Sequence, residues 1–254
     1  MIDTHCHLDA AEFDIDRDQI VALAFARGVS RIIIPSVAVD NFPQVKNKAL
    51  NYPSCHAAYG IHPLYVPQAS DKDITTLADW LRNEAPVAVG EIGLDFYIKD
   101  TDPERQIFFF TEQLKLARQF DLPVILHVRR AIDEVLKYLR RYTVRGGIAH
   151  AFNGSKQQAN EFIKLGFKLG FGGAMTYSGS TRIRALAASI PLENIVLETD
   201  APDIPPEWLN RGRNSPAELP RIAQVLADLR GVSLEEVTRV TSEAARQALP
   251  GLSG

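Results

Sequence analysis

The sequence has few of the residues that mark secreted and membrane proteins. Two cysteines among 254 residues are too few for a disulfide framework and fit a reducing compartment. No apolar run approaches the roughly 20 residues that a membrane-spanning helix needs, and the first residues show no basic-then-apolar pattern of a signal peptide. We therefore expect a soluble, cytoplasmic protein with no membrane partner.

An excess of positive charge is also missing. The formal net charge at pH 7 is -3, so no overall basic field attracts nucleic acid, and any such contact would be local. A Gly-rich phosphate-binding stretch is missing after the first apolar run, where His5-Cys6-His7-Leu8 stands instead. This argues against a dinucleotide-binding sheet. Hydrophobic residues nevertheless make up 46% of the chain, which is enough for a sizeable core.

Short apolar runs alternate with longer segments of helical spacing along the whole chain. Eight strand–helix units in order predict an α/β fold, a single (β/α)8 TIM barrel over residues 1–254, and such barrels commonly have about 250 residues. A doubly wound open sheet is the alternative. The expected strands are Ile2–His5, Arg31–Pro35, His56–Gly60, Val87–Ile92, Val124–His127, Gly147–His150, Lys168–Phe171 and Ile195–Glu198. The expected helices are Arg17–Arg27, Asn41–Asn51, Asp73–Asn83, Pro103–Phe120, Arg130–Tyr142, Ser155–Leu165, Ser180–Ser189, Pro216–Arg230 and Leu234–Leu249.

Five of the six histidines lie at or just past expected strand ends, and only His56 lies elsewhere. The carboxyl ends of the strands share one rim of a TIM barrel. His5 and His7 are two positions apart on a strand, so both face the same side. Taken alone, such a pair could equally be polar residues on a half-exposed strand. The five together predict a metal site at this rim.

Two divalent metal ions are expected there, because strands one and eight are neighbours in a closed barrel and strands five and six are adjacent. His5, His7 and Asp200 would hold one ion, His127 and His150 the other, and Glu91 would bridge them. Mixed imidazole and carboxylate ligands suit Zn, Mn, Co or Fe, and Mg less well. A bridging water would lose a proton near neutral pH and act as the nucleophile.

Asp200 and Glu91 are the expected catalytic residues. Asp200 would take the proton of the water or orient it, although a helix cap before Pro202 is the alternative role for this side chain. Glu198 lies two residues earlier on the same face and would support the ligands from behind. Asp95 and Tyr97 follow strand four and could simply order the loop there.

Substrate contacts are predicted from loops on the same rim. His62 precedes a proline after strand three, and Arg129 follows His127 by two residues, where a guanidinium would hold a phosphate. Arg129 could instead belong to the first turn of a solvated helix. The proline-rich stretch 202–216 carries Arg213 and Asn214, and long loops on this rim are often functional. A structural cover over the barrel is the alternative for this loop.

These motifs resemble, nearly end to end, the TatD family of metal-dependent deoxyribonucleases within the amidohydrolase-like barrels. The resembling segments are Ile2–Asp9, Gly60–Pro63, Gly90–Asp95, Pro123–Asp133 and Leu197–Pro202. The resemblance implies a TIM barrel, a divalent-metal centre and phosphodiester hydrolysis on DNA. The metal positions that it implies are His5, His7, Glu91, His127, His150 and Asp200.

Two stretches depart from the family pattern. His150-Ala151-Phe152-Asn153-Gly154 stands where the family usually has His-Cys-Phe-Ser-Gly, and Arg213-Asn214-Ser215-Pro216 stands where Arg-Asn-Glu-Pro is common. The second departure removes an acid from the expected substrate rim. The substrate class is therefore less firmly implied than the chemistry.

Three functions follow as hypotheses. The first is a phosphodiesterase, a deoxyribonuclease of exonuclease type that uses a metal-bound hydroxide on DNA or a small phosphodiester, since a net charge of -3 favours a short contact footprint. The alternative is a metal-dependent amide or ester hydrolase such as an aminoacyl deacylase. A metal-binding protein without catalysis is the third, and six ligands for two ions argue against it because they leave open coordination positions. The sequence predicts no oligomeric state.

Overall fold

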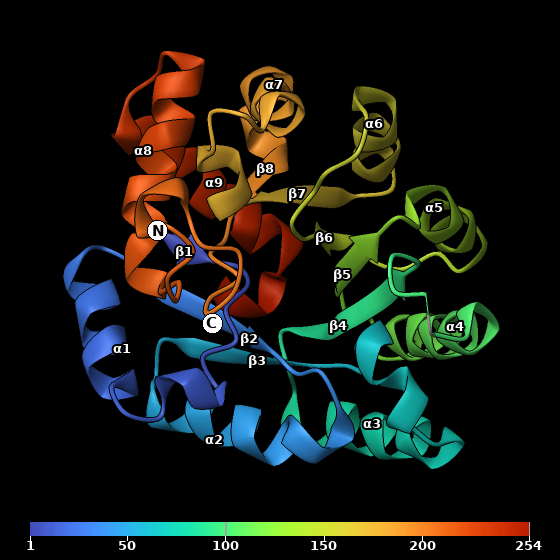
Figure 1. Ribbon diagram of the computed structural model, residues 1–254. Coiled ribbons are helices and arrows are strands. Elements are labelled where there is room, and N and C mark those ends of the chain that lie inside the picture. Colours follow the sequence, from blue (N-terminus) through green and yellow to red (C-terminus); the bar gives the residue numbers. More distant parts are fainter. Residues whose placement is uncertain (100, 254) are drawn as a thin grey trace.

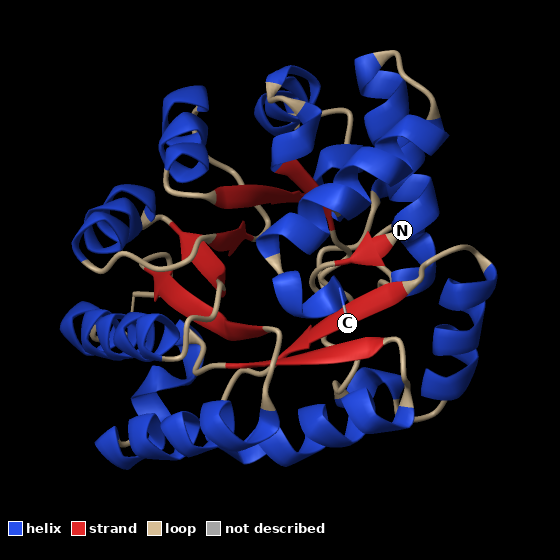
Figure 2. Ribbon diagram, turned by 180° about the vertical axis from the view of Figure 1, so that it is seen from behind, coloured by secondary structure: helices blue, strands red, loops and turns tan. Residues whose placement is uncertain are grey.

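A parallel eight-stranded sheet forms the centre of the molecule, with its strands in chain order. The computed structural model describes residues 1–99 and 101–253. Helices surround the sheet in both views (Figure 1, Figure 2). The strands are β1 (Ile2–Asp3), β2 (Arg31–Pro35), β3 (Cys55–Tyr59), β4 (Ala88–Asp95), β5 (Val124–Arg129), β6 (Gly147–Ala149), β7 (Phe167–Phe171) and β8 (Ile195–Leu197).

Backbone hydrogen bonds join the first strand to the last. The Thr4 amide donates to the Leu197 carbonyl over 3.0 Å, and the His7 amide donates to the Ala201 carbonyl over 2.8 Å. The predicted TIM barrel is confirmed. Strand ends differ by a few residues from the prediction, since β1 ends at Asp3, and β4 continues to Asp95. His5 and His7 therefore lie just past β1, where only the Cys6–Ala201 bridge continues the pairing.

Nine helices of the described chain follow the predicted order. Asp102 caps α4, where its side chain accepts hydrogen bonds from the amides of Glu104 and Arg105. The predicted helix Pro216–Arg230 is divided, because a short 3-10 turn precedes α8. None of the described helices is apolar over a stretch long enough to cross a membrane. The helices are α1 (Arg17–Ala26), α2 (Phe42–Asn51), α3 (Asp71–Glu84), α4 (Pro103–Gln119), α5 (Ile132–Arg141), α6 (Lys156–Lys164), α7 (Thr181–Ser189), α8 (Leu219–Arg230) and α9 (Leu234–Ala248).

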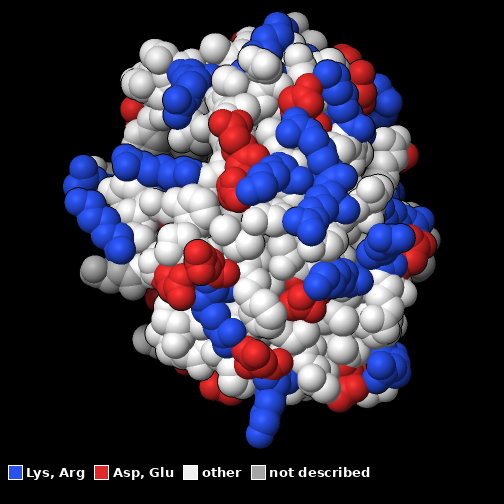
Figure 3. Space-filling model, turned by 90° about the vertical axis from the view of Figure 1, so that its right-hand side faces the viewer, with Lys and Arg blue, Asp and Glu red and all other residues white. Residues whose placement is uncertain are grey.

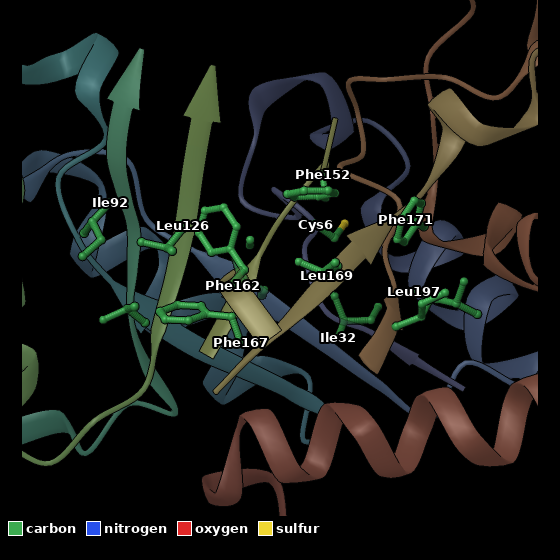
Figure 4. Packing of buried hydrophobic residues seen from close by; sticks show 14 of the residues in the cluster. Cys6, Ile32, Ile92, Leu126, Phe152, Phe162, Phe167, Leu169, Phe171 and Leu197 are labelled. Atoms are coloured by element: carbon green, nitrogen blue, oxygen red, sulfur yellow. The ribbon is translucent and has the colours of Figure 1, made fainter. Parts of the chain in front are cut away.

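Two large apolar clusters form the core, and the smaller of them closes one end of the barrel. The larger cluster lies between strands and outer helices, and Figure 4 shows Leu126, Leu169 and Phe167 in it together with Cys6. A smaller cluster joins residues of the strands to Ala245 on α9, which packs against the end where the strands begin. Because α9 closes that end, the carboxyl ends of the strands remain available for a site.

Candidate metal centre

Four side chains from three parts of the chain converge at the carboxyl end of the barrel. The His5 Nε2 lies 3.1 Å from the Glu91 Oε2 and 3.4 Å from the Asp200 Oδ1. The His7 Nε2 lies 3.6 Å and 3.7 Å from the same two oxygens. Ligand atoms that share one ion at bond lengths of about 2.0–2.2 Å stand about 3.0–3.6 Å apart. His5, His7 and Asp200 can therefore surround one divalent transition metal, and the Glu91 Oε2 lies close to both of these imidazoles.

The other oxygen of Glu91 faces a second set of ligands. The His127 Nδ1 and the His150 Nε2 both lie 3.0 Å from the Glu91 Oε1. One buried carboxylate thus divides its two oxygens between two groups of imidazoles, which is the geometry that a bridging ligand between two ions requires. The predicted metal residues are all brought together at this place.

The charge state of the centre also suits cations. Burial lowers the pKa of His5 to about 3, so its imidazole is neutral, as a metal ligand must be. Burial alone would raise the pKa of Glu91, but the neighbouring imidazoles, with His150 first, hold it well below its usual range. Burial likewise opposes protonation of His150, yet the Glu91 carboxylate beside it raises its pKa to about 10. The field that holds a proton there also favours a divalent ion.

The backbone departs from regular geometry where it presents these ligands. The pairing of β4 with β5 shifts register between Val89 and Ile92, so an irregularity in the strand places Glu91. Asp200 has a φ of 58°, and Ala151, which follows His150, has a φ of 45°. Non-glycine residues in the left-handed region are uncommon and gather at functional sites. The left-handed conformation therefore occurs at Asp200 itself and at the residue after His150.

Asp95 orients His127. Its buried carboxylate lies with Oδ2 3.1 Å from the His127 Nε2, and its Oδ1 accepts a hydrogen bond from the Tyr97 amide over 2.9 Å. Burial opposes protonation of His127, but the hydrogen bonds to Asp95 and Glu91 raise its pKa in the metal-free protein. When an ion replaces the proton on Nδ1, the Asp95 carboxylate would keep the other proton on Nε2 and so leave the lone pair of Nδ1 to the ion. A loop-ordering role was one possibility for Asp95 from the sequence, and its contact with the Tyr97 amide fits that role, whereas its contact with His127 was not expected. The available signal was that Glu91 and Asp95 are four residues apart on a strand and so share a face.

His62 lies beside the centre but turns the other ring nitrogen, Nε2, toward Glu91. Its Nδ1 accepts a hydrogen bond from the Leu64 amide over 3.1 Å, so the neutral ring carries its proton on Nε2. That Nε2 lies 3.5 Å from the Glu91 Oε1. Distance alone would allow His62, Glu91 and His127 to surround an ion. Because no lone pair remains on its Nε2, His62 is better suited to donate a hydrogen bond than to ligate a metal.

Two further buried acids support the ligands from behind. The Asp3 carboxylate accepts hydrogen bonds from the Thr199 amide over 3.0 Å and the Thr199 hydroxyl over 2.6 Å, which links β1 to the segment that carries Asp200. The Glu198 Oε1 accepts a hydrogen bond from the Ala151 amide over 2.6 Å. Burial raises the pKa of Asp3 to about 7 and that of Glu198 to about 8.

A missing side chain on β7 makes room for Glu198. A Cβ added to Gly170 would lie 2.1 Å from the Glu198 Oε2. The glycine therefore allows the carboxylate to pack directly against the backbone of β7, where it holds the amide that follows His150. Glu198 was expected to support the ligands, and its contacts show how it does so.

The centre opens into a cavity of about 1820 Å³. Its walls include Glu91, His127 and Asp200 from the centre, and also His62 and Arg129. The Arg129 side chain is 49% exposed, and its guanidinium comes no nearer than 4.0 Å to the Asp95 carboxylate. Two of the predicted substrate contacts therefore line the cavity beside the ligands.

The other two predicted substrate contacts must be corrected, because Arg213 and Asn214 are not among the residues that line this cavity. The Arg213 guanidinium pairs with the Asp16 carboxylate over 2.6 Å. Asn214 is fully buried, and its side-chain amide donates to the carbonyls of Thr199, Asp203 and Ile204. Both residues hold the loop onto the barrel, which is the covering role that was the alternative. The loop still reaches the cavity through neighbouring residues 202–204.

Relatives of this chain cover almost all of its length. The protein described as "Uncharacterized metal-dependent hydrolase YjjV" from Escherichia coli K12 is 42% identical over 94% of this chain and 93% of that protein. Another relative of this chain, described as "3'-5' ssDNA/RNA exonuclease TatD" from Erwinia billingiae, is 33% identical over 97% of this chain and 98% of that protein.

A solved structure agrees with these relatives. The crystal structure of the YjjV TatD homologue from Escherichia coli K12 superposes with a TM-score of 0.95 at 40% identity, covering 98% of both chains. Residues 2–250 match the family described as "TatD related DNase". The resemblance found in the motifs is confirmed, and the chain belongs to the family of TatD-related DNases.

Proposed function

We propose that this metal-dependent hydrolase cleaves phosphodiester bonds at the ends of single-stranded nucleic acid, with two divalent ions as cofactors. The observation that carries the proposal is the division of the two Glu91 oxygens between two sets of ligands at the floor of an open cavity. The Erwinia billingiae relative, whose printed description is a single-strand exonuclease, supports the choice of substrate. Zn, Mn, Co or Mg could occupy the centre on the chemistry of its donors.

Two ions held by these residues would act as Lewis acids on the phosphate and would lower the pKa of a coordinated water. Asp200 is suited to move the proton. Its Oδ1 faces His5 and His7, and within the described chain its other oxygen has no hydrogen-bond partner, so that oxygen remains to accept a proton. Burial raises the pKa of Asp200 above its ordinary value, which favours proton uptake.

His62 and Arg129 would contact the substrate. The Nε2 proton of His62 lies at the edge of the centre and can be donated to a phosphate oxygen on which negative charge develops. The Arg129 guanidinium can hold a phosphate with two parallel hydrogen bonds. Both side chains belong to the cavity wall, so substrate can reach them from outside.

The outer surface fits a substrate that enters the cavity rather than one that wraps the protein. Lys and Arg side chains are interspersed with Asp and Glu on the flank shown in Figure 3, and the net charge is -3. A protein that binds a long duplex neutralises many phosphates over an extended basic surface. A short contact with the end of a strand places fewer demands on the surface.

A panel of substrates tests the proposal. Protein stripped of metal is reloaded separately with Mg, Mn, Co or Zn and offered single-stranded DNA, RNA, duplex DNA, a chromogenic ester and a chromogenic amide. We expect release of mononucleotides from single strands with at least one metal. Turnover of the ester or amide much faster than of any phosphodiester would instead indicate the amide or ester hydrolase.

Glu91→Gln and Glu243→Gln form a matched pair of variants for this assay. Both substitutions replace one glutamate by glutamine, but Glu91 faces the imidazoles, whereas Glu243 is exposed on α9 away from the cavity wall. We expect Glu91→Gln to lose cleavage and Glu243→Gln to keep it. If folded wild-type protein cleaves no nucleic acid with any of the four metals, the proposed function is wrong.

A further inference from the structure

A tyrosine and two arginines form a cluster in the cavity wall beside the metal centre. The guanidinium carbon of Arg129 lies 3.8 Å from the centre of the Tyr97 ring, and that of Arg130 lies 4.7 Å from it. All three residues line the cavity, and Tyr97 is 46% exposed. An aromatic ring attracts a guanidinium and holds it flat, while the N–H groups at its edge stay available to an anion.

The cluster is tied to the metal centre through Asp95. One oxygen of this carboxylate accepts from the Tyr97 amide, and the other lies 3.1 Å from the His127 Nε2 and 4.0 Å from the Arg129 guanidinium. Arg130 has a φ of 53°, so the chain turns sharply where β5 ends and directs this residue into the wall. The two guanidinium groups are thus placed next to the ligands but are separated from Glu91 by His127 and Asp95.

The charges of the cavity are unevenly distributed. Arg129 and Arg130 stand where β5 leads into α5, and the two acids of α5 that also line the cavity are engaged, Asp133 with Gln158 and Glu134 with Lys137. Asp9, Glu12 and Asp40 stand on the segments that follow β1 and β2, where no Lys or Arg of the described chain lines the cavity. These two parts of the rim lie across the barrel from each other (Figure 1). A phosphate chain is attracted by the first side and repelled by the second. The wall therefore favours one direction for a polyanion that leaves the centre.

We propose that Tyr97, Arg129 and Arg130 form a second phosphate subsite. It binds the phosphate next to the one that is cleaved, so that the retained part of the strand runs over the start of α5. The terminal nucleotide, which carries no further phosphodiester, then lies on the acidic side. This inference rests on the proposed function for its substrate, and it explains why cleavage would be confined to strand ends.

Binding of a short fluorescein-labelled single-stranded DNA, followed by fluorescence anisotropy in EDTA at low ionic strength, tests the subsite without catalysis. Arg130→Gln and Tyr97→Leu are compared with Arg118→Gln, which removes the same charge from the exposed side of α4. We expect about tenfold weaker binding for Arg130→Gln, as for the loss of one charge-assisted hydrogen bond, and weaker binding for Tyr97→Leu. Arg118→Gln should bind as the wild type does.

The salt dependence and a second ligand identify what is bound. Each phosphate contact contributes about 0.7 to the slope of log affinity against log salt for a single strand, so Arg130→Gln should lower the slope by about this amount. An abasic oligomer of the same length should show the same loss. Equal affinity and slope for Arg130→Gln and Arg118→Gln, loss confined to the oligomer with bases, or no binding by the wild type would overturn the proposal.

The experiment separates this proposal from the proposed function. Anisotropy is measured without metal, so a protein that binds through Arg130 but cleaves nothing would overturn the function and keep the phosphate subsite. A protein that cleaves single strands while Arg130→Gln binds normally would keep the function and overturn the subsite.

Discussion

Asp95→Asn offers a sharp test of how the centre is built. In the folded protein, the Tyr97 amide donates to the Asp95 Oδ1, so an asparagine at this position would keep its oxygen there and turn its NH2 group toward His127. The NH2 group of the asparagine and a protonated Nε2 of His127 are both donors and cannot form a hydrogen bond with each other. The neutral His127 ring would therefore have to move its proton to Nδ1. The atom that faces Glu91 across 3.0 Å would then carry a proton in place of a lone pair.

Asp95→Asn should weaken the binding of one of the two ions, and only moderately. Carboxylates that orient a metal-ligating histidine typically contribute about 10–100-fold to metal affinity, which corresponds to about 1.4–2.7 kcal/mol. We expect this loss for the ion held by His127 and His150, and a much smaller change for the ion held by His5, His7 and Asp200. The shape of the side chain is unchanged, so the fold should be retained.

Calorimetric titration of the metal-free protein with Zn²⁺ measures both affinities, and nitrogen-15 NMR of the histidine rings reports the tautomer of His127. Asp121→Asn is the matched control, because Asp121 pairs with Arg145 at an exposed position away from the cavity. Two ions bound with wild-type affinity by Asp95→Asn, with His127 still protonated on Nε2, would refute the reasoning.

Three further variants probe the residues around the ligands. In the metal-free protein, burial raises the pKa of Glu198 from 4.5 to about 8. Between these two pH values the folded state keeps a proton that the unfolded chain releases, so the free energy of unfolding falls as pH rises. Glu198→Gln should remove about 1.4 kcal/mol per pH unit of that fall, as measured by urea denaturation in EDTA. If the free energy of unfolding of the variant falls with pH as steeply as that of the wild type, the assignment is contradicted. Gly170→Ala places a Cβ 2.1 Å from the Glu198 carboxylate, whereas the added Cβ of Gly179→Ala meets nothing within 4 Å. Thermal unfolding should show Gly170→Ala destabilised by about 1–3 kcal/mol and Gly179→Ala nearly unchanged. Equal melting temperatures for the two variants would count against the packing described. His62→Leu should lower kcat about 100-fold while elemental analysis still finds the wild-type metal content, and loss of an ion would show instead that His62 is a ligand.

The convergence of the expected metal residues could be predicted from sequence because a barrel places all of its strand ends on one rim. His127 lies on β5 and His150 directly follows β6, and counting strands is enough to bring them together. Asp95 was assigned only to its loop because the predicted strand ended at Ile92, while β4 continues to Asp95 and carries that side chain to His127. The length of a strand depends on pairing with β5, which no local pattern reveals.

The loop that follows Asp200 shows the limit more clearly. Arg213 and Asn214 are the polar residues that a substrate loop would be expected to offer. Arg213 instead pairs with Asp16, which is 197 residues away in sequence. Asn214 donates to the buried carbonyl of Thr199 and to the partly buried carbonyls of Asp203 and Ile204. Buried carbonyl groups need donors, and this demand of the folded chain decided the orientation of Asn214. The tautomers of His62 and His127 were likewise fixed by contacts that form only on folding.

The most direct test of the account is the rate of nucleotide release from single-stranded DNA as a function of the number of ions bound per chain. Metal-free protein is titrated with Mn²⁺, and bound metal and released nucleotide are measured in the same samples. If Glu91 bridges two ions that act together, release should be negligible with one ion bound and should rise as the second binds. Full activity with one ion per chain, or no release with both positions filled, would contradict the account.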